Sequence, residues 1–220
     1  MVKNFIKLMV LSSVILTMAT GTVSSQSLSM RTGRAIAQPS TAIQETATEA
    51  MYRLNSSKQT SMNLSGTTPV KNWTMTANGL SGDAKICFLK GGLVDVESLI
   101  FKLPVYNLKG EVKAMDEDAY EALKADRHKE IIFKLIDSKV SLQSNSQYLV
   151  EARGTLTVAG VTKPVTLRMN ATIDRDGTVS FTGSQILKMS DYDVERPSLL
   201  FGTIKAGNEM TLTYKLNFTK

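Results

Sequence analysis

Apolar and polar residues alternate almost without exception along the last segment of the chain, from Glu209 to Thr219. Successive side chains of a strand point to opposite faces, so this segment predicts a strand with one apolar and one polar face. The same alternation runs from Val165 to Ile173. Two long strands that each bury a single side predict an antiparallel sheet curled around an apolar interior.

Turn residues divide the preceding sequence into further segments with strand character. The Gly91-Gly92, Ala159-Gly160 and Asp176-Gly177 pairs mark three of the turns. A loop over 190–207 comes before the last strand. The remaining strands are expected over 51–58, 60–65, 73–77, 84–90, 93–105, 131–142, 148–158, 163–174 and 178–188.

One segment, Met115 to Arg127, has helical rather than strand spacing. Ala119, Tyr120 and Leu123 share one face, and Asp116 is placed to cap the helix. We therefore expect a short helix with its apolar side over one end of the sheet. Such a helix either forms a lid over the interior or plugs a packed core, and its amphipathic pattern fits both arrangements.

The amino terminus has the character of a secretory signal. Lys3 and Lys7 come before an apolar stretch over 8–18 that is short for a membrane span and is followed by small residues. We expect cleavage after Ser25 or Ala19, with a retained anchor as the alternative. The predicted organisation is a signal peptide over 1–25, a flexible leader over 26–50 and one folded domain over 51–220, in the periplasm or outside the cell.

Composition removes several functional classes. The net charge of +6 falls to +4 without Lys3 and Lys7, and no basic run is interleaved with aromatic residues, so nucleic-acid binding has little support. Cys87 is the only cysteine, which excludes an intramolecular disulfide and predicts a small buried side chain. His128 is the only histidine, so multi-histidine metal sites and a triad that requires a separate, oriented base have little support.

Small residues occupy part of the predicted inner face. Ala152 and Gly154 lie in the middle of one strand, and Gly183 lies on another. Missing side-chain volume either lets the walls approach or leaves a cavity. Met75, Met169 and Met210 also fall on inner faces, where flexible thioethers would line an apolar tunnel as well as fill a core. A strand of ten residues is about 33 Å long, a length that suits an extended hydrocarbon.

Several of these segments resemble a known family. The sequence GTLTVAGVTKPVTL from Gly154 to Leu167, the sequence GSQILKMSDY from Gly183 to Tyr192 and the alternating last strand are similar to the YceI-like family of secreted and periplasmic polyisoprenoid-binding proteins. Residues upstream keep the order of that family's central region: Ser65-Gly66, Trp73, Leu108, Met115, Tyr120, Leu123 and His128 to Phe133. The resemblance as a whole therefore spans roughly 51–220. Lys129 follows His128 where the family often has proline, which argues against a fixed role for His128.

The resemblance implies a mainly β fold, a lipocalin-like antiparallel barrel with one short helix near its mouth. It also implies that the apolar pore binds a long-chain isoprenoid or related lipid, which is sequestered or transported. The expected pore residues are Trp73, Met75, Phe101, Phe133, Leu135, Ala152, Leu167, Met169, Phe181 and Tyr214, with Tyr120 and Leu123 near the mouth. No catalytic residue, metal or cofactor is expected, and a homodimer or a protein partner in the cell envelope stays open.

Two other functional classes compete with lipid binding. A barrel with a filled interior would act as a structural or interaction protein through loops such as 190–207. An enzyme would need its acid and base groups in the acidic loop of Asp191, Asp193 and Glu195, a kind of cluster that is usually solvated. We therefore expect a non-enzymatic binding protein.

Overall fold

The computed structural model describes residues 46–56, 60–144, 146–199 and 204–220. The predicted signal peptide lies outside these residues, as does the predicted leader up to residue 45. The first strand begins at Thr48, three residues before the expected start of the folded domain. No helix among the described residues is long and apolar enough to cross a membrane.

The described chain is mainly antiparallel β structure with one short α-helix, which confirms the predicted fold class. The strands found in the sequence are present with shifts of a few residues at their ends. The strands are β1 (Thr48–Leu54), β2 (Ser61–Thr67), β3 (Asn72–Ala77), β4 (Ser81–Leu89), β5 (Gly92–Pro104), β6 (Leu108–Lys109), β7 (Glu130–Ser144), β8 (Gln147–Val158), β9 (Val161–Ile173), β10 (Val179–Lys188), β11 (Ser198–Leu199), β12 (Ile204–Lys205) and β13 (Glu209–Thr219).

Eight of these strands form a closed ring. Their order is β1, β4, β5, β7, β8, β9, β10 and β13, and β13 pairs back with β1. The closing contact is short, because only Arg53 and Leu54 of β1 lie opposite Thr219 and Phe218 of β13. The ring has an interior because the apolar face of each alternating strand turns inward.

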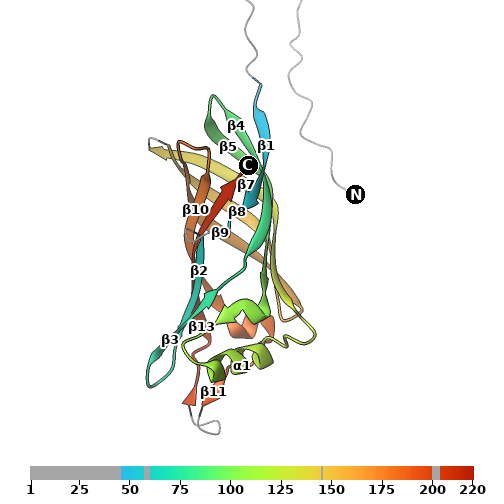
Figure 1. Cartoon of the computed structure of the whole chain (residues 1–220), viewed down its shortest axis with the longest axis vertical. Coiled ribbons are helices and arrows are strands. Elements are labelled where there is room, and N and C mark those ends of the chain that lie inside the picture. The colour runs from blue at the N-terminus through green and yellow to red at the C-terminus, as the bar shows by residue number, and fades with distance from the viewer. Residues whose placement is uncertain (1–45, 57–59, 145, 200–203) are drawn as a thin grey trace, which may run out of the picture. The chain divides into compact units, whose positions relative to one another are not determined.

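The first part of β13 pairs with β2 rather than β1, from Met210 opposite Gly66 to Lys215 opposite Ser61. β2 then pairs with β3, and β3 pairs with β6. In Figure 1 this branch, α1 and β11 lie toward the lower end of the view, away from the carboxyl terminus. One end of the ring is therefore extended by additional elements, which create the walls of the site described below.

The helix α1 (Lys113–Ala122) begins two residues earlier and ends five residues earlier than the sequence predicts. The predicted cap is wrong, because the residue before the helix is Val112 and no side chain caps that end. Asp116 is instead buried, and its carboxylate accepts a hydrogen bond of 2.6 Å from the Gly110 amide. Asp116 thus fastens α1 to the preceding loop, a tertiary contact that spacing within the helix does not reveal.

Aromatic rings pack closely in the interior of the ring. Phe133, Phe181 and Phe218 are fully buried, and the rings of Phe181 and Phe218 meet edge to face at 5.7 Å. Met169 and Ala152 are also buried in this cluster. Close packing of this kind stabilises the fold and leaves little open space.

Candidate functional site

An apolar cavity of about 270 Å³ lies at the α1 end of the ring. Its walls come from the inner faces of the strands, from α1 and from the segment after β10. The strand residues in the lining are Met62, Leu64, Trp73, Met75, Ala77, Phe101, Leu103, Leu108, Ile131, Leu156, Val158, Leu187, Ile204, Met210 and Leu212. Residues from elements far apart in sequence therefore form one continuous apolar surface.

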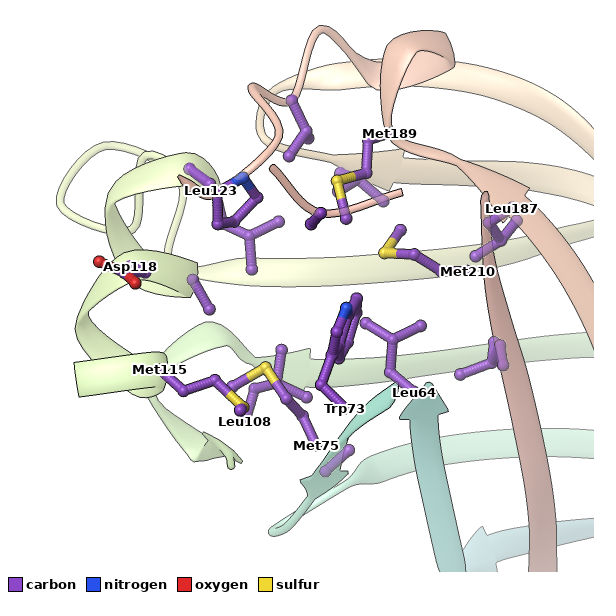
Figure 2. Close-up of a pocket in the computed structure, with 18 of the residues that line it drawn as sticks. Leu64, Trp73, Met75, Leu108, Met115, Asp118, Leu123, Leu187, Met189 and Met210 are labelled. Atoms are coloured by element: carbon purple, nitrogen blue, oxygen red, sulfur yellow. The ribbon is translucent and has the colours of Figure 1, made fainter. Parts of the chain in front are cut away.

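Trp73 is a central element of this lining. Figure 2 shows its indole among Leu64, Met75 and Met210. Trp73 lies on β3 opposite Gly66 of β2, and a Cβ atom built on Gly66 would come within 2.3 Å of the indole ring. Gly66 therefore leaves the space in which the indole lies flat against the neighbouring strand.

The helix α1 forms one wall of the cavity through Met115 and Ala119, together with Leu123, the residue directly after the helix. Its opposite side is held by Tyr120, whose hydroxyl accepts a hydrogen bond from Lys109 and lies within hydrogen-bonding distance of the Leu108 and Tyr106 carbonyls. The Lys109 ammonium also lies 3.4 Å from the Asp116 carboxylate. These contacts fix the apolar face of α1 toward the interior.

The short 3₁₀ helix η2 (Met189–Tyr192) forms the facing wall. Met189 and Tyr192 are buried and line the cavity, and burial raises the pKa of the Tyr192 hydroxyl. The Lys124 ammonium donates a hydrogen bond of 3.4 Å to the Asp193 carbonyl, which links the chain after α1 to the chain after η2. The two walls are thus connected at one side of the cavity.

Charged groups are confined to the edge of the lining. The charged lining residues are Lys71, which is exposed and lies 3.3 Å from Glu111, and Asp118, which is half-buried. Thr68 holds the turn between β2 and β3 by donating a hydrogen bond of 2.8 Å to the Lys71 carbonyl. An apolar interior with polar groups at its edge suits an amphiphile whose polar end stays near solvent.

The structure divides the twelve sequence-predicted pore residues into three groups. Trp73, Met75, Phe101 and Leu123 line the cavity. Tyr120 fastens the outer side of α1, as described above. The other seven lie in the packed core rather than in the lining: Phe133, Leu135, Ala152, Leu167, Met169, Phe181 and Tyr214.

The small residues of the inner face are covered by aromatic rings. A Cβ atom on Gly154 would lie 2.7 Å from the Phe133 ring, and one on Gly183 would lie 2.5 Å from the Tyr214 hydroxyl. The space that these glycines leave is therefore occupied by side chains from neighbouring strands. This packing explains why the middle of β8 does not open into the cavity.

Several lining residues were not among the twelve, including Met62, Leu103, Met115, Leu187 and Met189. Alternation identifies the inner face of a strand, but it does not show how far the cavity extends along that strand. Met210 was identified by alternation as an inward-facing methionine, and it does line the cavity. For Met189 no periodic signal exists, because it lies in a 3₁₀ turn.

Cys87 differs from its prediction, because it is half-buried on the outer side of the sheet rather than inside the core. Glu49, Cys87 and Glu97 place their ligand atoms within 4.8 Å of one another. The Lys85 ammonium already contacts both carboxylates, at 2.5 Å from Glu49 and 2.7 Å from Glu97. Burial first, and then the neighbouring carboxylates, raise the pKa of the Cys87 thiol, which favours the protonated form over a metal-binding thiolate.

The closed antiparallel ring and the apolar cavity at its end are typical of the class of β-barrel-type proteins. The model of the YceI-like domain matches residues 45–218. The chain therefore belongs to the YceI-like family. No curated protein matches the chain.

Solved structures of similar fold support the architecture. BcnA of Burkholderia cenocepacia is 15% identical with a TM-score of 0.60, over 76% of this chain and 99% of that one. A polyisoprenoid-binding domain from Saccharophagus degradans, implicated in plant cell wall breakdown, is 12% identical with a TM-score of 0.58, over 76% and 97%. The YceI protein of Campylobacter jejuni is 19% identical with a TM-score of 0.50, over 66% and 84%.

Proposed function

We propose that this protein binds an isoprenoid or similar amphiphile, with the apolar chain of the ligand inside the cavity at the α1 end. The observation that carries the proposal is the continuous apolar lining built from β2, β3, β5, β13, α1 and η2. Membership of the YceI-like family and similarity to a structure described as a polyisoprenoid-binding domain support the same ligand class.

Apolar burial supplies the affinity in this proposal. Transfer of apolar surface from water contributes roughly 25 cal/mol per Å², less the cost of ordering the ligand chain. Met75, Met115 and Met210 line the cavity with flexible thioethers, which adapt to chains without a rigid shape. The polar end of the ligand lies near Lys71 and Asp118, so its head group stays partly in water.

The alternative function, a structural or interaction protein with a filled barrel, predicts that side chains fill the whole interior. Side chains fill only one half of the ring. Phe181 and Phe218 close the half away from α1, whereas Trp73 and Met210 face an open cavity at the other end. The open cavity supports ligand binding over a purely structural role. A homodimer and an envelope protein partner stay predictions that size-exclusion chromatography and affinity capture test.

We also propose that the protein acts outside the cytoplasm and holds its ligand without chemical conversion. The signal-like sequence over 8–18 supports export, and the apolar lining supports binding rather than catalysis. Fractionation of cells that express the full chain tests export. Retention of the unprocessed chain with the cytoplasmic proteins would contradict this part of the proposal.

Native mass spectrometry of the protein purified without detergent tests the binding function. We expect an added mass, and organic extraction should release an amphiphile with an apolar chain. Trp73 provides a second readout, because the only tryptophan of the chain lies in the cavity wall. Ligand addition should change its fluorescence. A protein that stays free of ligand, with unchanged fluorescence in the presence of prenyl and fatty lipids, would refute the function.

A further inference from the structure

The cavity occupies only part of the long strands β8 and β13. On β13 the lining residues are Met210 and Leu212, whereas Tyr214, Leu216 and Phe218 of the same inner face are buried in the core. On β8 the lining residues are Leu156 and Val158. Met210 to Leu212 covers about 7 Å of β13 at the usual rise per residue. The lined stretch of this strand is therefore much shorter than the strand.

Two buried lining side chains border the packed core. Met62 lies opposite Tyr214 in the strand pairing, and Phe101 lies opposite Phe133. We call Met62 and Phe101 the cavity floor. The Phe101 ring stacks on the Phe133 ring with centroids 5.6 Å apart and an interplanar angle of 20°.

The residues behind the floor prevent it from receding. Phe133 has no exposed surface, and its ring lies against Gly154, where even a Cβ atom would overlap it. Tyr214 lies opposite Met62 in the strand pairing and is also buried. A ligand chain that extended past Phe101 would have to displace this packed layer, which close packing makes costly.

We propose that the cavity floor limits chain length, so that the ligand is an amphiphile with a short prenyl or alkyl chain rather than a long polyprenyl chain. This inference rests on the proposed binding function and specifies its ligand class. A long chain would leave much of its apolar surface in water, because only its end would enter the cavity. The volume of about 270 Å³ lies near the lower end of typical ligand sites.

A comparison of two prenyl alcohols tests the proposal. The purified protein is incubated with phosphatidylcholine vesicles that contain either farnesol, a short prenyl alcohol, or solanesol, a long one. After removal of the vesicles, native mass spectrometry and extraction measure the bound alcohol, and Trp73 fluorescence reports occupancy. We expect farnesol to bind at least about tenfold more tightly than solanesol. Equal binding of both alcohols would overturn the length limit while leaving the binding function intact.

Variants locate the limit. Phe101→Ala, and the milder Phe101→Leu in case the first fails to fold, should reduce the preference for farnesol about tenfold by opening the floor. Phe181→Leu is the matched control. It also reduces the volume of a buried aromatic side chain, but Phe181 does not line the cavity. An unchanged preference in folded Phe101 variants, or an equal change in Phe181→Leu, would refute the role of the floor. Binding of neither alcohol to the parent protein would refute the length limit and the prenyl-binding function together.

Discussion

At the scale of single residues, Tyr214 combines tight burial with an unsatisfied polar group. Its side chain is 6% exposed, and among the described residues its hydroxyl has no hydrogen-bond partner. The ring extends over Gly183 of the neighbouring strand, where any larger residue would collide with it. The apolar contacts of the ring stabilise the core, but the desolvated hydroxyl opposes that gain.

Tyr214→Phe should therefore stabilise the protein. The substitution removes an unpaired buried hydroxyl and keeps the aromatic ring. It is therefore expected to raise the free energy of unfolding by about 1–2 kcal/mol. Urea denaturation measures the change. Tyr106→Phe serves as the control, because its exposed hydroxyl donates a hydrogen bond of 2.7 Å to Asp126 and its loss should not stabilise. A lower unfolding free energy for Tyr214→Phe would show that the hydroxyl is paired in solution.

The same residue predicts how stability depends on alkaline pH. Burial raises the pKa of Tyr214 from 10.0 to about 12, so the folded protein keeps this proton at a pH where the unfolded chain loses it. Stability should be independent of this group below pH 10 and fall by roughly 2–3 kcal/mol as pH rises toward 12. Tyr214→Phe should remove the fall that this group contributes. A further fall should remain in the variant, because burial also raises the pKa values of Tyr52 and Tyr192.

Substitution of Gly66 should change the cavity wall and the affinity for the ligand. Gly66→Ala places a methyl group where the Trp73 indole now lies, at 2.3 Å, so the indole must move. We expect an altered Trp73 fluorescence spectrum and at least about tenfold weaker ligand binding, with the fold retained. Titration with farnesol measures both effects. Unchanged affinity despite a displaced indole would mean that the ligand does not depend on this wall.

At the scale of elements, α1 is positioned by polar contacts on its outer side and by apolar contacts on its inner side. Asp116 and Tyr120 connect it to the segment around β6. Met115 and Leu123 face the cavity. The element is a wall of the site rather than a plug, since space remains between it and the sheet. This arrangement resolves the two possibilities that the amphipathic pattern left open.

Asp116→Ala should loosen α1. It removes a buried charge-assisted hydrogen bond to the Gly110 amide and the ion pair with Lys109, so a loss of about 1–3 kcal/mol in unfolding free energy is expected. Glu117→Gln is the matched control on the same helix, because its pair with Lys113 is exposed and should contribute little. Thermal unfolding and ligand titration measure the two variants. Equal effects of both substitutions would contradict the anchoring role of Asp116.

At the scale of the whole molecule, the ring depends on a junction between its first and last strands. β1 joins β4 along most of its length and joins β13 only at Arg53 and Leu54. β13 is shared among β10, β1 and β2, so it links the closed ring to the branch that carries the cavity wall. Closure and cavity formation therefore depend on the same strand.

Truncation tests this organisation. A chain that begins at Gln44 should keep the melting temperature and the ligand affinity of the full chain, because the closed ring starts at Thr48. A chain that begins at Asn55 should lose cooperative unfolding, because β4 and β13 would each lose their β1 partner. Calorimetry compares the two chains. A cooperative transition in the shorter chain would show that β1 is dispensable.

Much of this architecture could be predicted from local patterns. Alternation identified Met210 and Leu212 as inward-facing, and turn residues such as Gly160 and Gly177 marked the ends of strands correctly. The cavity was less predictable. Ala152 and Gly154 suggested open space in the middle of β8, but Phe133 from the neighbouring strand occupies it.

The sequence alone determined the mainly antiparallel β class, the positions of its long strands and the family, because a period of two and turn residues are local properties of the chain. Only the tertiary structure decided which inward-facing residues surround open space. That depends on side chains from strands distant in sequence, as with Tyr214 over Gly183 and Phe133 over Gly154. It also depends on where α1 docks, because Met115 and Leu123 complete a wall that no single strand pattern encodes.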